Sequence, residues 1–136
     1  MLKIVGIDHI VLRTGKLEAM LHFYCEVLGC TLERETEPEL GLVQVRAGNA
    51  LIDLVTLDSK LGRMGGGAPT QGDNNLDHFC LQIEPLSEEE ICAHLQAHKI
   101  AFGKFAERYG AEGFGRSLYI KDPEDNTVEL RTRRLG

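Results

Sequence analysis

An internal repeat constrains the fold of this chain more than any other feature of its sequence. Residues 7–13 and residues 76–82 both read as an apolar residue, then Asp, then His, then a run in which apolar residues alternate. Such alternation predicts a half-buried β-strand. Because a repeated unit folds on the same plan each time, the chain is expected to consist of two similar halves.

A helix is predicted after each of these two strands. In the first half, apolar residues recur at helical spacing through Leu17, Met20, Leu21, Tyr24, Val27 and Leu28. Gly29 follows as the expected C-terminal stop. The second helix is predicted to begin at Ser87, because Glu90 completes a capping box, and to continue towards Ile100.

Three more strands are predicted after each helix. They are residues 31–35, 41–47 and 49–55 in the first half, and residues 102–105, 115–121 and 126–131 in the second. Each half then reads βαβββ, which predicts a single α+β domain over residues 1–136 with curved mixed sheets enclosing a metal-binding pocket. The modules span about residues 1–57 and 76–136. The Gly- and Pro-containing linker, about residues 58–75, is expected to be mobile.

Strand alternation gives the same orientation to four side chains that can bind metal. In each strand the apolar residues are expected to face the core, so the residues between them face the other side. His9 and His78 take that other side in the repeated strands, and Asp53 and Glu129 take it in the closing strands. Two imidazoles and two carboxylates predict a nitrogen and oxygen site for a divalent metal.

The remaining histidines lie on the predicted helices. His94 and His98 are four residues apart, a spacing that can hold zinc on a helix face. No Glu follows His94, however, so the pattern of helical zinc enzymes is incomplete. A solvated helix face is the favoured interpretation.

Charge and composition exclude several classes of function. The chain has 15 basic and 21 acidic residues, a net charge of −6, which argues against a nucleic-acid-binding protein. It has no apolar run of the roughly 20 residues that span a bilayer, and no signal-peptide pattern. A cytoplasmic protein that does not bind membranes is therefore expected, with its four cysteines reduced.

Three motifs carry a resemblance to a known family. They are Asp8-His9-Ile10 at the start, Phe-Tyr-x-x-x-Leu-Gly ending at Gly29, and Asp-Pro-x-x-Asn-x-x-Glu ending at Glu129. Together they resemble the vicinal oxygen chelate superfamily of glyoxalase I, extradiol dioxygenases, fosfomycin thiol transferases and bleomycin-binding proteins. Within it the chain is most similar to small glyoxalase-domain proteins of the lactoylglutathione-lyase-like group.

The resemblance implies a ligand set and an assembly. The family's metal ligands fall on His9, His78 and Glu129, and Asp53 stands where glyoxalase I has a Glu as fourth ligand. One divalent ion is expected, drawn from Zn, Ni, Mn, Co and Fe. A homodimer is also expected, with the site at or near the interface between the two chains.

The resemblance further implies an enzyme acting on a small molecule with vicinal oxygens. Lyase or isomerase chemistry through a metal-stabilised enediolate ranks first, with Glu129 as the first candidate base and Asp53 as the second. Three alternatives stay open: an extradiol-type dioxygenase with a two-His-one-carboxylate iron site, a thiol transferase, and a non-enzymatic protein that binds small drug-like molecules.

Four further residues are candidates for contact with the substrate. Arg13 and Arg131 share the metal-facing side by strand alternation, where either guanidinium can hold an anionic group. Tyr119 has the same orientation if its strand runs unbroken from Ser117. Tyr109 is placed in a Gly-rich loop that can cover the ligand.

Overall fold

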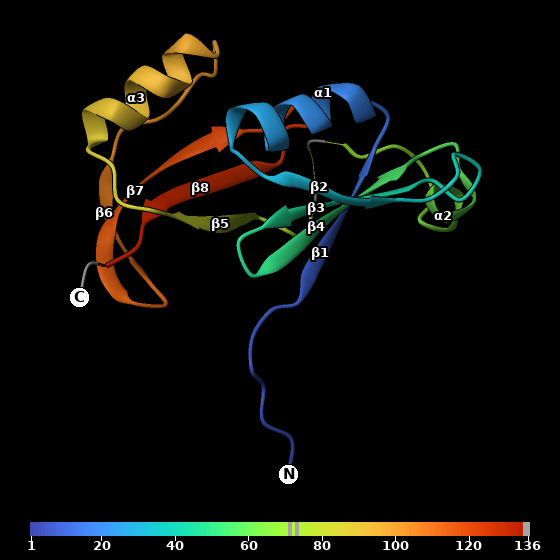
Figure 1. The fold of residues 1–136 in the computed structure, drawn as a ribbon, viewed down its shortest axis with the longest axis horizontal. Helices are drawn as coiled ribbons and strands as arrows, with labels where there is room; N and C mark the ends of the chain where they lie inside the picture. The colour runs from blue at the N-terminus through green and yellow to red at the C-terminus, as the bar shows by residue number, and fades with distance from the viewer. Residues whose placement is uncertain (71, 73, 135–136) are drawn as a thin grey trace. The chain divides into compact units, whose positions relative to one another are not determined.

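The chain folds into two compact units, each built on one mixed four-stranded sheet (Figure 1). A computed structural model describes residues 1–70, 72 and 74–134. The first unit is Met1–Thr70 and the second is Gln71–Gly136.

The first unit has strand order β1-β4-β3-β2, with β1 parallel to β4 and the other neighbours antiparallel. A helical segment follows β1 and packs on one face of the sheet (Figure 1). The elements are β1 (His9–Thr14), α1 (Leu17–Leu21), η1 (His22–Val27), β2 (Thr31–Glu35), β3 (Leu42–Ala47), β4 (Ala50–Thr56) and α2 (Lys60–Met64).

The second unit repeats this plan in the order β5-β8-β7-β6, with β5 parallel to β8. Its elements are β5 (His78–Ile83), α3 (Glu88–Ala97), β6 (Ala106–Gly110), β7 (Gly113–Lys121) and β8 (Thr127–Thr132). The matching strand order confirms the predicted repeat and the α+β class with two βαβββ modules. Each sheet is open, because an edge strand remains on both sides.

The helix boundaries follow the predicted signals. Gly29 has a φ of 84°, a left-handed conformation that suits glycine, and it ends the first helical segment. The backbone N–H of Leu28 donates to the carbonyl of Phe23, five residues earlier, so η1 is a π-helix. The capping box of Ser87 and Glu90 is present at the start of α3, as predicted.

Helix and sheet share an apolar core in each unit. In the first, Met20 and Tyr24 are fully buried beside Leu54 of β4. In the second, Ile91 and Leu95 are the buried residues of α3, and Leu118, Ile120 and Val128 are buried on its strands. Because these apolar residues occupy alternate strand positions, the residues between them face the opposite side of each sheet.

The strand predicted at residues 102–105 is wrong. The strand that pairs with β7 is β6, Ala106–Gly110, and Phe102 makes only an isolated bridge with Ile120. Gly110 pairs with Gly113, whose φ is 94°, so the two strands close into a hairpin at these glycines. The apolar residues Phe102 and Phe105 therefore lie just before the strand, which begins at Ala106.

The predicted mobile linker contains the short helix α2. The Ser59 side chain caps it by accepting from the Gly62 N–H at 3.1 Å, and Gly62 is buried against the end of β4. Positions 71 and 73 of the predicted linker lie outside the described residues.

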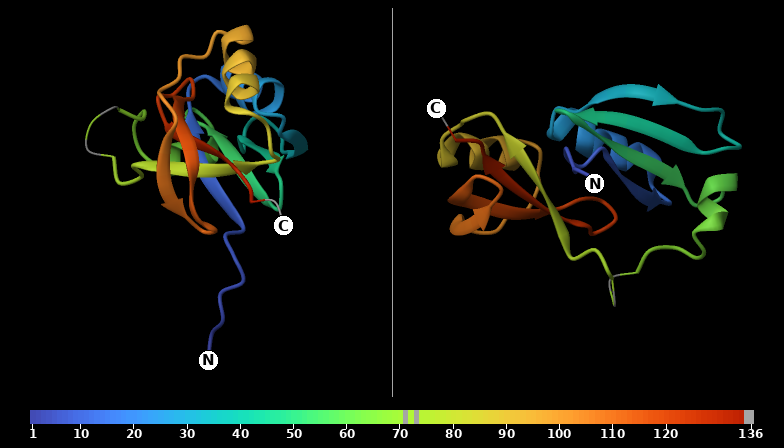
Figure 2. Two further views of the ribbon diagram at one scale, coloured as in Figure 1. Left: turned by 90° about the vertical axis from the view of Figure 1, so that its left-hand side faces the viewer. Right: turned by 90° about the horizontal axis from the view of Figure 1, so that it is seen from below.

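Residues 1–8 form neither helix nor strand and extend away from the first sheet (Figures 1 and 2). Among the residues that the structure describes, no helix has both the length and the apolar character needed to cross a membrane.

Candidate metal centre

The first unit brings His9 and Asp53 together on adjacent parallel strands. His9 begins β1, and Asp53 lies at the middle of β4, in register with Val11. His9 Nε2 lies 4.0 Å from Asp53 Oδ2. The other carboxylate oxygen of Asp53 accepts a hydrogen bond from the Gln44 side chain at 3.1 Å. The carboxylate is buried, with 7% of its side chain exposed, whereas the imidazole is 46% exposed.

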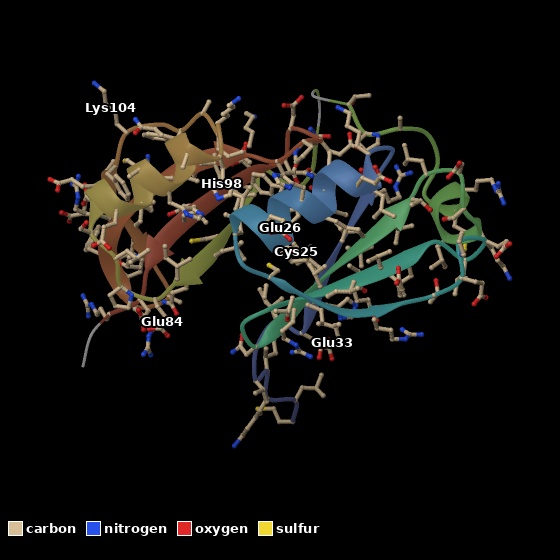
Figure 3. The ribbon with its side chains drawn as sticks, turned by 45° about the horizontal axis from the view of Figure 1, so that its top comes forward. Cys25, Glu26, Glu33, Glu84, His98 and Lys104 are labelled. Carbon is tan, nitrogen blue, oxygen red and sulfur yellow. The ribbon has the colours of Figure 1, made fainter. Side chains whose placement is uncertain are left out.

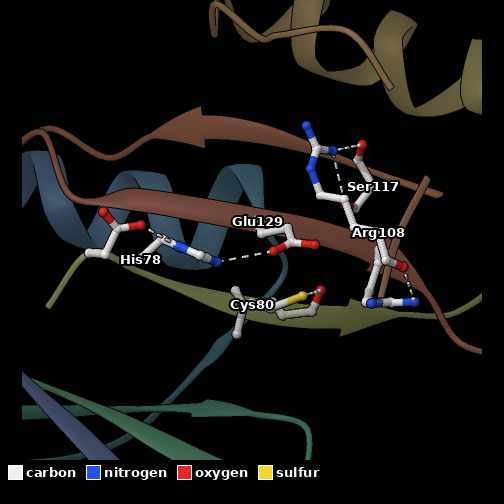
Figure 4. Close-up of polar contacts among 8 residues, drawn as sticks. His78, Cys80, Arg108, Ser117 and Glu129 are labelled. Atoms are coloured by element: carbon white, nitrogen blue, oxygen red, sulfur yellow. Dashed lines mark hydrogen bonds and ion pairs between the residues drawn. The ribbon is translucent and has the colours of Figure 1, made fainter. Parts of the chain in front are cut away.

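The second unit makes the same pair with a shorter contact. His78 begins β5 and Glu129 lies in β8, in register with Cys80. His78 Nε2 lies 3.2 Å from Glu129 Oε1 (Figure 4). The Glu129 side chain is 8% exposed and that of His78 is 34% exposed. The strand alternation predicted for these residues therefore holds within each unit.

Each histidine is also held at its other ring nitrogen by the preceding aspartate. Asp8 Oδ1 lies 2.7 Å from His9 Nδ1, and Asp77 Oδ2 lies 2.7 Å from His78 Nδ1. The hydrogen bond with Asp8, followed by the negative charge of Asp53, raises the pKa of His9 above 6.5. The sequence has an Asp before each His, but strand alternation predicted no role for that Asp.

These donors fit a divalent metal in chemistry and, in one unit, in spacing. Two ligand atoms on one metal at bond lengths of about 2.1 Å lie roughly 3.0–3.5 Å apart. The contact of 3.2 Å between His78 and Glu129 meets this condition, and the 4.0 Å between His9 and Asp53 is longer. Asp53 lacks the additional methylene of Glu129. Among the described residues, no group of three or more His, Cys, Asp or Glu side chains has a geometry that could hold a metal ion.

Tyr119 lies beside the second pair, as its strand position predicted. It is in register with Glu129, and its ring meets that of His78 edge-on at 5.3 Å. The Arg108 guanidinium stacks over the Tyr119 ring, with its central carbon 4.3 Å from the ring centre. Arg108 also donates to the Ser117 hydroxyl at 3.1 Å (Figure 4). Sequence reasoning missed Arg108 because β6 was expected to lie earlier in the chain.

Cys80 lies two residues after His78 on β5, in register with Glu129 (Figure 4). Burial, together with the charge of Glu129, raises the pKa of its thiol to about 11, and Arg131 opposes this shift. The thiol is therefore protonated at neutral pH and is a poor nucleophile there.

The predicted substrate arginines have backbone partners in the structure. Arg13 donates to the carbonyls of Gly66 at 3.1 Å and Gly67 at 2.7 Å, so it holds the segment after α2. Arg131 is buried and donates to the Gly113 carbonyl at 3.1 Å. Its guanidinium fills the space that side chains at Gly110 and Gly115 would occupy.

The loop position predicted for Tyr109 is wrong. Tyr109 lies in β6 and stacks edge-on with Phe114, with ring centres 5.0 Å apart. It alternates with Arg108 along the strand, so it faces away from His78 and Tyr119. The misplaced strand is the cause of this error.

The helical histidines of the second unit lie on α3, not on the strands that carry His78 and Glu129. His94 lies near the C-terminal end of α3 and His98 caps this helix, with their ring centres 4.7 Å apart. Cys25 and Glu26 lie on η1 (Figure 3). Burial, followed by the charge of Glu26, raises the pKa of the Cys25 thiol, which favours the reduced and unreactive form.

Residues 6–130 match the family model of the Glyoxalase/Bleomycin resistance protein/Dioxygenase superfamily. The chain belongs to this superfamily. The match spans both modules, so it includes both His–carboxylate pairs and confirms the resemblance seen in the sequence motifs.

Two curated relatives of the superfamily differ in length and name. The catechol-2,3-dioxygenase of Bacillus subtilis is 26% identical over 131 residues, which are 96% of this chain and 41% of the relative. The virulence protein STM3117 of Salmonella typhimurium is 29% identical over 128 residues, 91% of this chain and 81% of the relative. This chain thus spans less than half the length of the dioxygenase.

Solved structures share the fold. The crystal structure of STM3117 aligns with a TM-score of 0.73 at 22% identity, covering 98% of this chain and 100% of that one. A lactoylglutathione lyase from Agrobacterium tumefaciens aligns with a TM-score of 0.67 at 24% identity, covering 94% and 93%. At these identities the alignments show the common fold.

Proposed function

We propose that the protein binds one divalent metal through His9, His78 and Glu129, with Asp53 as fourth ligand, and acts as a lyase or isomerase of the glyoxalase type. One observation carries the proposal: both modules place a buried carboxylate opposite the Nε2 of a histidine at the same point of the same topology. A buried carboxylate is stable only with a charged or hydrogen-bonding partner, and a metal supplies one.

The residues have separate tasks in this proposal. When bound, the metal supplies a Lewis acid that polarises the vicinal oxygens of the substrate. The carboxylate of Glu129 is the first candidate to move a proton between adjacent carbons, and that of Asp53 is the second. Arg131 and Arg108 place two guanidinium groups on the Glu129 face, which favours a substrate with an anionic group.

The proposed assembly is a homodimer in the cytoplasm, with the site at or near the interface. Each module has two edge strands, β1 and β2 in the first and β5 and β6 in the second. Edge strands with an unpaired side favour association with another chain, which can pair with them or cover them. The ligand pairs lie at such an edge, because β1 and β5 carry the histidines.

A dioxygenase is the second candidate, and the likeness to a catechol-2,3-dioxygenase favours it. An iron site of this kind uses two histidines and one carboxylate with open positions for oxygen. The test compares turnover of a hemithioacetal with a redox-inactive metal, and oxygen-dependent catechol cleavage with Fe(II). The matched variants are Asp53→Ala and Asp53→Glu, the latter with the longer side chain of Glu129.

We expect hemithioacetal turnover that is strongly reduced in Asp53→Ala and kept in Asp53→Glu. Catechol cleavage that needs oxygen and survives Asp53→Ala would replace the lyase proposal by the dioxygenase one. A protein that binds metal yet turns over neither substrate class would contradict both and leave the thiol transferase and the non-enzymatic binding protein.

A further inference from the structure

Asp8 and Asp77 make the same contact in two modules of different sequence. Each carboxylate lies 2.7 Å from the Nδ1 of the following histidine. Both are almost fully solvated, with side chains 90% and 95% exposed, so neither serves the apolar core. A contact that recurs with the same atom and the same length indicates a role for that nitrogen.

The backbone holds Asp8 and its histidine at a fixed point of the sheet. The Asp8 carbonyl accepts from the Leu51 N–H at 3.0 Å, which attaches the residue to β4 before β1 begins. His9 is in register with Leu51, and His78 is in register with Thr127 at the equivalent point of the second sheet. The backbone of Asp8 is therefore fixed to the sheet, and its carboxylate meets the Nδ1 side of the His9 ring.

A carboxylate at Nδ1 selects one tautomer of a neutral imidazole. The carboxylate only accepts hydrogen bonds, so it stabilises the proton on Nδ1 and leaves the lone pair on Nε2. For His9 this preference is unopposed, because Asp53 at 4.0 Å lies beyond hydrogen-bonding distance of Nε2. Nε2 is also the atom that faces the buried carboxylate in each unit.

We propose that Asp8 is a positioning residue, which holds His9 as the Nδ1-protonated tautomer with Nε2 free to bind metal; Asp77 makes the same contact with His78, whose Nε2 also lies 3.2 Å from Glu129 Oε1. The metal-binding part of this inference rests on the proposed function, whereas the tautomer belongs to the metal-free protein. A carboxylate behind a ligating histidine also fixes the ring and raises its basicity.

The two modules differ in how strongly the ring depends on its aspartate. His78 has further contacts with the Tyr119 ring and with Glu129 at 3.2 Å. At the position equivalent to Tyr119, the first unit has Gln44, which bonds the Asp53 carboxylate. His9 should therefore respond more than His78 to loss of its aspartate.

The first test reads the tautomer by ¹⁵N NMR of the imidazoles in metal-free protein at about pH 9.5, where histidine is neutral. His9 should be Nδ1-protonated in the wild type and shift towards the Nε2-protonated form in Asp8→Ala. Asp8→Asn keeps an oxygen that accepts a hydrogen bond, so it should restore the wild-type tautomer. Asp58→Ala, which removes an exposed carboxylate from the same unit, is the control and should change nothing.

The second test measures zinc affinity of the same proteins by competition with a chromogenic chelator. Asp8→Ala should weaken binding by roughly 10- to 100-fold, Asp77→Ala by less, and Asp58→Ala not at all. An unchanged His9 tautomer in Asp8→Ala overturns the proposal, and a changed tautomer with unchanged zinc affinity overturns its link to metal binding. A wild-type protein without zinc affinity contradicts the proposed function, and the NMR result then decides the tautomer alone.

Discussion

Each half of the chain pairs an accessible histidine with a carboxylate that water barely reaches. Such burial is unfavourable for a charged group, and the partners seen are few: the Gln44 amide for Asp53 and the His78 imidazole for Glu129. A cation would compensate the charge of both carboxylates. The charge of Glu129 also acts on the neighbouring Cys80, where it can be measured.

Alkylation of Cys80 should report the charge of Glu129. Iodoacetamide reacts with the thiolate, so in metal-free protein the Cys80 rate should rise only as the pH approaches about 11. Glu129→Gln removes the negative charge and should shift this profile to lower pH, while burial keeps part of the elevation. Peptide mass spectrometry resolves Cys80 from the other cysteines, and Asp53→Asn is the control. A profile that is the same in Glu129→Gln would contradict the electrostatic account.

Strand alternation correctly placed His9 and Asp53 on one face of the first sheet, and His78 and Glu129 on one face of the second. It works because the neighbouring apolar residues have only one side of the sheet on which to pack. It could not find the hydrogen bonds of Asp8 and Asp77, which depend on side-chain rotation before the strand begins. Nor could it find Arg108, whose place on the site face depends on the register of β6 with β7.

At the scale of elements, the predicted linker contains a helix, α2, that its composition did not predict. The glycines of this linker indicated a mobile segment, and three of them contact strands of the first sheet. Arg13 of β1 holds the carbonyls of Gly66 and Gly67, and Gly62 lies against the backbone of β4. At Gly62 the missing side chain allows close packing against the backbone, and sequence composition alone does not distinguish such a glycine from one in a flexible segment.

Gly62→Ala should therefore displace α2. A Cβ at this position would lie 1.8 Å from the Thr56 carbonyl oxygen, which belongs to backbone and cannot rotate away. We expect a loss of about 1–3 kcal/mol in the free energy of unfolding. Gly67→Ala is the control, because its added Cβ has no atom within 4 Å. Urea denaturation curves measure both, and equal midpoints for the two variants would contradict the packing of Gly62.

At the scale of the whole molecule, the sequence repeat predicted the same βαβββ order of elements in both modules. It succeeded because the copies share their apolar alternation, and that alternation determines which face each strand buries. The repeat does not predict what covers the edges of the two sheets. These edges are four strands that each pair on one side only: β1, β2, β5 and β6.

Those edges lead to a prediction about assembly. A homodimer should form, because a second copy can pair or cover strands that one chain leaves open. Light scattering coupled to size exclusion should give twice the chain mass of 15.1 kDa. A monomer that still binds metal at full occupancy would contradict a site shared between chains.

Metal content tests the central claim most directly. We expect elemental analysis of purified protein to find one divalent ion per chain, as the proposed function requires. His9→Ala and His78→Ala should each lose that ion, because each removes a proposed ligand. His94→Ala, which removes an imidazole from α3, should retain it. Full metal occupancy in both His9→Ala and His78→Ala would contradict the account.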